Sequence, residues 1–176
     1  MEEKKRRSVY AWATRFKRKY SFTIASRIKQ HSKIIERILD RDEEVLYAFC
    51  GQKNDSNVSL FQSCVVALTN KRIIIGQNRV VYGYFITSIT PDLFNDLKIN
   101  SSLFWGSVII DTNKELVHIS NLDKSSLDEI ETRVNRIITD DKLRLRAMKE
   151  TQKEQEAKVE VVEVKKEDGQ NEQEEK

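Results

Sequence analysis

The residues that could carry out chemistry are few and scattered along the chain. Two histidines are present, and the periodicity places His31 in an N-terminal helix and His118 in a late strand, on its polar face. The acidic residues Asp92, Asp96 and Asp111 stand next to predicted turns, where capping and turn formation explain them. Catalysis would need a nucleophile with a base, paired carboxylates or clustered metal ligands. The sequence therefore predicts no catalytic residue and no enzyme activity.

The two cysteines, Cys50 and Cys64, are too few for a disulfide framework and have no companion pair for a metal site. The chain has five glycines and no glycine-rich phosphate loop, so the sequence predicts neither a cofactor nor a metal. If residues 54–57 form the turn between the first two strands, antiparallel pairing puts Cys50 opposite Cys64 or one pair away. Facing strand cysteines lie slightly too far apart for an unstrained disulfide, and a reducing cytosol favours thiols. We expect neighbouring, unbonded cysteines.

The positive charge of the chain is concentrated at its N-terminus. The net charge is +3, but residues 1–41 hold 13 Lys or Arg against 4 Asp or Glu, whereas residues 42–138 and residues 139–176 each hold 9 against 12. No run of about 18 apolar residues occurs, and the basic start lacks the apolar core of a secretory signal. We therefore expect a cytoplasmic protein, placed at the inner face of the membrane if the basic segment binds lipid.

Residues 9–39 carry apolar side chains at helical spacing. This apolar stripe consists of Val9, Trp12, Ala13, Phe16, Tyr20, Ile24, His31, Ile34, Ile35 and Ile38. Basic residues lie on the opposite side, although Arg27 falls inside the stripe and Phe22 outside it. A single helix of this span would be about 45 Å long, which is longer than a small domain is wide. The helix therefore either breaks near residues 21–23 or projects from the domain, and we expect the break.

The candidate interaction surface is the basic and aromatic first part of this segment. It comprises Lys4, Lys5, Arg6, Arg7, Trp12, Arg15, Phe16, Lys17, Arg18, Lys19 and Tyr20. The apolar stripe could pack on the rest of the domain or on the same helix of a second subunit, leaving the charges solvated. It could instead enter a membrane interface while the cations meet anionic lipid headgroups, at about 1 kcal/mol each. Nucleic acid is the least expected partner, because no recognition helix or stacking platform accompanies the charges.

After residue 44 the pattern changes to β-branched and aromatic clusters separated by turn residues. The predicted strands span residues 45–51, 60–68, 72–75, 80–89, 97–99, 103–110 and 116–119. Seven short strands joined by short turns are typical of an antiparallel sandwich or barrel. Ser126 and Glu129 then match a capping box, which predicts a helix whose apolar face runs to Ile138.

Beyond Asp140 the helical periodicity fades. Leu143, Leu145 and Met148 could extend the helix by two turns, but residues 152–176 are mostly Glu, Lys and Gln. Such a segment buries too little apolar area to offset its conformational entropy, so we expect it to be disordered. The predicted parts are a basic helical segment in residues 1–42, a barrel with its helix in residues 43–139, and a charged tail in residues 140–176.

The segment from Val65 to Ile75 resembles the strand-turn-strand signature of bacterial pleckstrin-homology-like (PH-like) domains of the YokE-like type and of related GRAM domains. The apolar first strand runs into Thr69, Asn70, Lys71 and Arg72, and a second apolar strand follows. Asn70 tolerates the left-handed backbone of a tight hairpin, and the Thr69 hydroxyl can hold the turn. The resemblance covers residues 43–139. It implies an α+β fold, with a PH-like antiparallel seven-stranded β-barrel closed by a C-terminal α-helix, here preceded by an N-terminal basic amphipathic helical segment.

Two departures limit what the resemblance implies. The basic segment is not part of the core module, and the tryptophan of the eukaryotic PH helix is absent, with Trp105 in a strand instead. Lipid recognition as in the eukaryotic domains therefore does not carry over. We predict a non-enzymatic PH-like interaction module that mediates protein-protein association or oligomerisation in the bacterial cytoplasm. The alternative is a peripheral membrane protein that binds anionic lipid headgroups through the basic amphipathic helix of residues 4–29.

Overall fold

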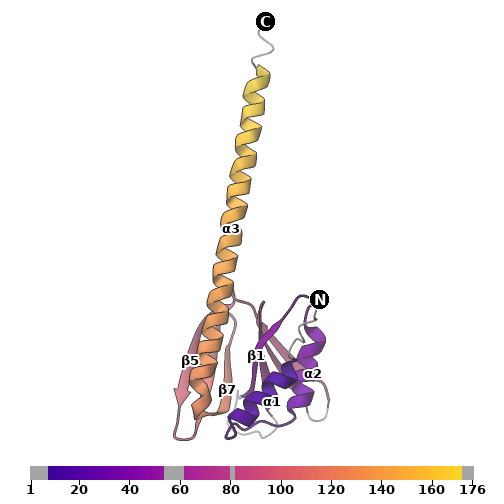
Figure 1. The fold of residues 1–176 in the computed structure, drawn as a ribbon, viewed down its shortest axis with the longest axis vertical. Coiled ribbons are helices and arrows are strands. Elements are labelled where there is room, and N and C mark those ends of the chain that lie inside the picture. The colour runs from indigo at the N-terminus through magenta and orange to yellow at the C-terminus, as the bar shows by residue number, and fades with distance from the viewer. Residues whose placement is uncertain (1–7, 54–61, 80–81, 172–176) are drawn as a thin grey trace, which may run out of the picture. The chain divides into compact units, whose positions relative to one another are not determined.

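The computed structural model describes residues 8–53, 62–79 and 82–171. Its elements follow one another as α1 (Val9–Lys19), α2 (Ile28–Ile38), β1 (Val45–Lys53), β2 (Ser63–Thr69), β3 (Ile73–Asn78), β4 (Tyr84–Ile89), β5 (Phe94–Ser101), β6 (Trp105–Thr112), β7 (Leu116–Asp123), a short 3-10 helix (Lys124–Ser126) and α3 (Leu127–Asn171), as Figure 1 shows. The chain divides into two compact units, Met1–Thr139 and Asp140–Lys176. Within the described residues, no helix is both long enough and apolar enough to cross a membrane.

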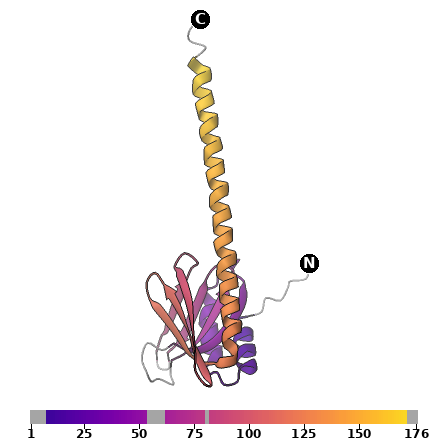
Figure 2. The same cartoon turned by 90° about the vertical axis from the view of Figure 1, so that its left-hand side faces the viewer.

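The seven strands form one antiparallel sheet in the order β4-β3-β2-β1-β7-β6-β5. Two hairpin systems meet where β1 and β7 pair, with Gln52 opposite Ser120 and Lys53 opposite Ile119. The sheet curls into a half-barrel beside the first turns of α3 (Figure 2). The buried side chains of that helix start, Leu127, Ile130 and Val134, belong to the same core as the strands. The expected α+β, PH-like arrangement is therefore present, and each of its seven strands overlaps one of the seven predicted along the chain.

The N-terminal segment breaks where the sequence predicts. α1 ends at Lys19, where the Lys17 ammonium donates to the carbonyl oxygen of Ser21 at 2.7 Å. α2 begins only after Arg27, whose φ of 52° is left-handed and incompatible with a continuous helix. The break allows each half of the apolar stripe to pack on a different part of the sheet.

The two N-terminal helices cover strands through their apolar faces. Val9 and Ala13 of α1 are fully buried, and this helix packs on β1. α2 packs on β3 so closely that a Cβ added at Gly76 would lie 2.5 Å from Cγ1 of Ile35. Because no side chain larger than hydrogen fits there, Gly76 sets the distance between α2 and the sheet.

The cysteines lie on paired strands. Cys50 faces Val65 while Cys64 faces Gly51, so the two cysteines are one pair apart, as predicted. Successive residues of a strand point to opposite faces, so the two thiols lie on opposite faces of the sheet. Both are free and buried, and burial raises the pKa of each thiol to about 12. The predicted turn at residues 54–57 lies outside the described residues.

Two expectations about α3 differ from the structure. The capping box does not form, because the short 3-10 helix already includes Ser126, whose hydroxyl donates to the carbonyl oxygen of Asp123 at 2.7 Å. The Asp123 carboxylate caps this turn instead, accepting from the Ser125 N–H at 3.0 Å. At the other end, α3 continues to Asn171 where disorder is expected from residue 152. Glu, Lys, Gln and Ala are strong helix formers, which favours helix even without a buried face.

Candidate functional site

The structure divides the candidate interaction surface by burial. Lys4, Lys5, Arg6 and Arg7 lie outside the described residues. Phe16 and Tyr20 are buried, and Trp12 is half-buried beside them. The exposed cations of α1 are Arg15, Arg18 and Lys19, and Lys17 is half-exposed. The apolar side of α1 is therefore occupied by packing on the sheet, and its cationic side faces solvent.

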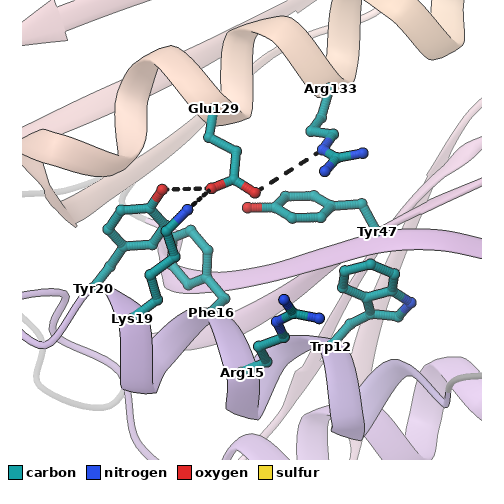
Figure 3. A pocket seen from close by; sticks show the side chains of 8 residues that line it. All are labelled: Trp12, Arg15, Phe16, Lys19, Tyr20, Tyr47, Glu129 and Arg133. Carbon is teal, nitrogen blue, oxygen red and sulfur yellow. Dashed lines mark hydrogen bonds and ion pairs between the residues drawn. The ribbon is translucent and has the colours of Figure 1, made fainter.

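Five of the predicted surface residues line one small pocket between α1, β1 and the start of α3, with a volume of about 220 Å³. The lining residues are Trp12, Arg15, Phe16, Lys19, Tyr20, Tyr47, Glu129 and Arg133. Figure 3 shows how these side chains converge from the three elements. Three cations and one carboxylate give the lining a net positive charge.

Glu129 is the polar centre of this pocket. Its Oε2 accepts from the Lys19 ammonium at 2.6 Å and from the Tyr20 hydroxyl at 2.5 Å, as the dashed lines of Figure 3 show. Its Oε1 forms an ion pair with Arg133 at 4.0 Å. Burial raises the pKa of Glu129, but the hydrogen bonds from Lys19 and Tyr20 outweigh it, so the pKa lies below its usual value. Glu129 is therefore an anion that joins α1 to α3.

Tyr47 forms the floor of the pocket on β1. It is buried, and burial, followed by the negative charge of Glu129, raises the pKa of its hydroxyl well above the usual range. The Arg133 guanidinium lies over its ring, 5.4 Å from the centroid. This pocket therefore serves as a structural joint.

Tyr47, Glu129 and Arg133 are pocket residues that the sequence reasoning missed. They come from β1 and α3, far from α1 along the chain, and periodicity does not tell which distant elements meet. Within the described part of the chain, no group of His, Cys, Asp and Glu could hold a metal ion. His118 is half-buried on β7, and His31 is buried in α2, so the two histidines share no site.

The hairpin motif lies in the β2–β3 turn, as predicted, and it binds the segment that leads from α2 into β1. Thr69 donates its hydroxyl to Oε1 of Glu43 at 2.8 Å. Arg72 donates to the same carboxylate from Nε at 2.9 Å and from an η nitrogen at 2.8 Å. Burial raises the pKa of Glu43, but its hydrogen bonds, that of Arg72 first, outweigh it and lower the pKa overall.

The other two motif residues bind the same segment from the surface. Asn70 accepts the Glu44 N–H at 2.8 Å and donates its side-chain amide to the Asp42 carbonyl oxygen at 3.2 Å. Among the described non-glycine residues only Arg27 and Asn121 have a positive φ. Asn70 therefore does not adopt the left-handed backbone that was predicted for it. The Lys71 ammonium reaches Asp42 at 2.7 Å and Asp40 at 3.2 Å. The motif thus clamps residues 40–44 to the hairpin, which is a structural role.

A second surface, which the sequence reasoning missed, is formed by two neighbouring loops. Phe22 follows α1 and is 63% exposed; Leu103 and Phe104, in the β5–β6 turn, are 76% and 57% exposed, and Trp105 is 40% exposed. We call these four residues the loop patch. The indole N–H of Trp105 donates to the carbonyl oxygen of Phe22 at 2.9 Å, which fixes the two loops side by side. The only sequence signal was that Phe22 fell outside the apolar stripe.

Cations border the loop patch. Lys19 and Lys124 line a shallow depression of about 730 Å³ together with Phe22, Leu103 and Phe104. The Lys124 N–H also donates to the Phe104 carbonyl oxygen at 3.2 Å, so this lysine is fixed beside the β5–β6 turn. Of the acidic neighbours, Asp123 is buried and Asp128 is exposed. The loop patch therefore combines exposed aromatic side chains with a border of two lysines and two aspartates.

Comparisons with known proteins identify the family. The sequence model described as "Bacterial PH domain" matches residues 39–136. Among solved structures, the chain is similar to a DUF1696 family protein with a pleckstrin-homology domain from Shewanella loihica PV-4, with 11% identity, a TM-score of 0.39, and coverage of 64% of this chain and 93% of that one. It is also similar to a pleckstrin homology domain from Shewanella amazonensis SB2B, with 12% identity, a TM-score of 0.39, and coverage of 62% and 85%. The search of curated proteins gives no match. Because the family model matches more than half of the sequence, the chain belongs to the bacterial PH domain family.

Proposed function

We propose that this protein is a non-enzymatic PH-like module that attaches to anionic membrane surfaces through the loop patch. The observation that carries the proposal is the exposure of Phe22, Leu103 and Phe104 on two loops that the Trp105 hydrogen bond holds together. Aromatic and leucine side chains at the tip of a domain can enter the boundary between headgroups and acyl chains without refolding of the domain. PH-like domains generally mediate protein or lipid interactions.

Two exposed lysines beside the loop patch would meet the headgroups of an anionic lipid surface. Lys19 and Lys124 are exposed beside the loop patch, and of the two aspartates that line the same depression Asp123 is buried and Asp128 is exposed. Each cation close to an anionic membrane contributes about 1 kcal/mol of attraction. The exposed apolar side chains, together with these two lysines, therefore support an anionic membrane as the occupant of the loop patch.

This mode differs from insertion of an amphipathic helix, the alternative drawn from the sequence. Val9, Ala13 and Phe16 would have to leave the core before the apolar side of α1 could enter a membrane. Removing three such side chains from the core costs several kcal/mol at about 1.5–3 kcal/mol for each large one. The loop patch needs no such rearrangement, because its apolar side chains are exposed while α1 stays in place.

The test is co-sedimentation of the full-length protein with vesicles. We expect binding to vesicles of phosphatidylcholine with about one third phosphatidylglycerol, at about 0.1 M salt where attraction is only partly screened, and little binding to phosphatidylcholine alone. The double variant Leu103→Ser and Phe104→Ser should lose most of the bound fraction, because it removes apolar area that is exposed in the folded protein. Lys124→Glu should weaken binding to the anionic vesicles.

Leu116→Ser is the matched control. Leu116 is also an exposed apolar residue, but it pairs with Asp111 at the end of the β6–β7 hairpin opposite to the end where Trp105 pairs with Asp123. This variant should bind vesicles as the unchanged protein does. Equal binding by the loop-patch variants and the control would contradict the proposal, and capture of another protein by the loop patch without vesicle binding would support protein association instead.

A further inference from the structure

β4 forms one edge of the sheet. β4 is the last strand of the sheet order, so within the described residues its outer backbone groups face no paired strand. Natural edge strands are usually protected against pairing by charged side chains, proline, bulges or an irregular register. β4 has none of these, because its sequence Tyr-Phe-Ile-Thr-Ser-Ile is uncharged and it pairs with β3 over six consecutive residues without a register shift.

The opposite edge, β5, shows what protection looks like in the same molecule. β5 carries Asp96 and Lys98, and its register with β6 shifts between Phe94 and Asp96. Both edge strands have exposed residues, so exposure does not distinguish β4 from β5. The contrast is one of chemistry, since β5 bears opposite charges and a bulge, whereas β4 presents Tyr84 and Phe85 at 60% and 49% exposure.

We propose that β4 pairs antiparallel with β4 of a second copy of this chain, forming a two-fold symmetric dimer with a continuous sheet. A two-fold axis perpendicular to the sheet preserves its faces, so each pair must join residues whose side chains point to the same face. The register centred on Ile86 meets this condition. It places Ile86 opposite Ile86, Phe85 opposite Thr87, and Tyr84 opposite Ser88 of the second copy.

The chemistry of β4 favours a second copy as the occupant. Each aromatic residue of the pair meets a small or β-branched residue, and aromatic with β-branched pairs stabilise antiparallel sheets. No charge faces a like charge within the ladder, because β4 carries none. The next possible centre, Thr87, would shift Pro91 toward the ladder, where it cannot donate a hydrogen bond. The centre at Ile86 is therefore the favoured register.

Three cations from outside β4 modulate this dimer. The Arg79 guanidinium lies over the Phe85 ring, 4.1 Å from its centroid, and Arg72 donates from an η nitrogen to the Ser88 hydroxyl oxygen at 3.4 Å. The Lys53 ammonium lies 3.3 Å from the Thr87 hydroxyl oxygen. Pairing would bring Lys53, Arg72 and Arg79 of one copy toward the same cations of the other, and their repulsion is screened by salt. The dimer should therefore strengthen with rising salt, which is opposite to the salt dependence expected for binding to anionic vesicles.

The experiment is sedimentation equilibrium of the full-length protein over a range of concentrations. We expect a reversible dimer for the unchanged sequence. The double variant Tyr84→Lys and Ser88→Lys places lysine opposite lysine twice in the proposed register, so its dissociation constant should rise about tenfold or more. The variant Tyr84→Glu and Ser88→Lys places opposite charges in the same positions and should keep the dimer.

The charge-swap pair makes the test specific for the register, because both variants change the same two exposed positions. Asn100→Lys on β5 is the control for adding charge to a sheet edge, and it should leave the dissociation constant unchanged. A monomer at all concentrations for the unchanged sequence would overturn the proposal. So would a dimer equally tight in the Lys-Lys and Glu-Lys variants, because the contact would then lie elsewhere, and so would selective pairing of β4 with a foreign extended peptide.

Discussion

Trp105 donates its indole N–H to the backbone carbonyl oxygen of Phe22 at 2.9 Å, across a separation of 83 residues. This bond joins the loop after α1 to the start of β6. It places the exposed rings of Phe22 and Phe104 in one surface, because Phe104 is the neighbour of Trp105 and its ring centroid lies 6.0 Å from the indole. The loop after α1 therefore belongs to the loop patch, whereas α1 and α2 pack on the core.

Replacing Trp105 with phenylalanine should loosen this junction while keeping an aromatic ring. We expect the free energy of unfolding to fall by about 1 kcal/mol, the usual net contribution of one hydrogen bond. Chemical denaturation measures this loss. An unchanged denaturation midpoint would show that this hydrogen bond does not stabilise the folded state. The control is Phe104→Leu, which leaves the bond in place and should change the midpoint little.

Arg72→Ala should be the most damaging change in the hairpin motif. The Glu43 side chain has 0% exposure in its ion pair with Arg72, so removing the guanidinium leaves a buried carboxylate without its counter-charge. Breaking a buried pair on one side costs about 3 kcal/mol or more. Lys71→Ala is the matched control, because its ion pairs with Asp40 and Asp42 are exposed and should contribute less than about 1 kcal/mol. Equal losses in thermal denaturation would contradict the clamp described above.

His31 should make the fold sensitive to mild acid. Its Nδ1 accepts the Asn78 N–H at 2.8 Å, and burial, followed by the charge of Arg27, lowers its pKa from 6.5 to about 4. The unfolded chain therefore binds a proton more readily than the folded one between these values. The contribution of His31 to the free energy of unfolding is fully present above about pH 6.5. It declines as the pH falls toward 4, by about 3 kcal/mol at most.

Denaturation at several pH values measures this dependence. His31→Gln should be less stable at neutral pH, but its stability should change less between pH 6.5 and 4.5 than that of the unchanged protein. His118→Gln is the control and should keep the full decline. The carboxylates of Glu43 and Glu129 have lowered pKa values, so they act in a lower window, as the pH falls below their unfolded values. A flat profile for the unchanged protein between pH 6.5 and 4.5 would contradict the account of His31.

The sequence predicts the fold well because its signals are local. Hydrophobic alternation and turn residues mark the seven strands, and the Thr69–Arg72 hairpin is a short-range motif whose neighbours are set by the turn itself. The break after α1 also follows from the length of the stripe. Each of these features depends on residues that are close along the chain.

The surfaces could not be predicted in the same way, because they depend on contacts between distant segments. The basic side of α1 was visible, but whether its apolar side was free depended on β1. Phe22 and Phe104 form one surface only because the fold brings two loops together, and Glu129, matched to a capping box by its spacing from Ser126, instead binds Lys19 and Tyr20. The sequence shows that β4 has no charged residue, but it does not show that β4 lies at the edge of the sheet.

The most direct test of membrane attachment is the quenching of Trp105 fluorescence by vesicles whose acyl chains carry bromine. The chain has two tryptophans, so the difference between the unchanged protein and Trp105→Phe isolates Trp105. At lipid concentrations where both proteins sediment with anionic vesicles, we predict strong quenching in the unchanged protein and little in Trp105→Phe, where half-buried Trp12 remains. Sedimentation with the vesicles but equal, weak quenching in both proteins would contradict insertion of the loop patch.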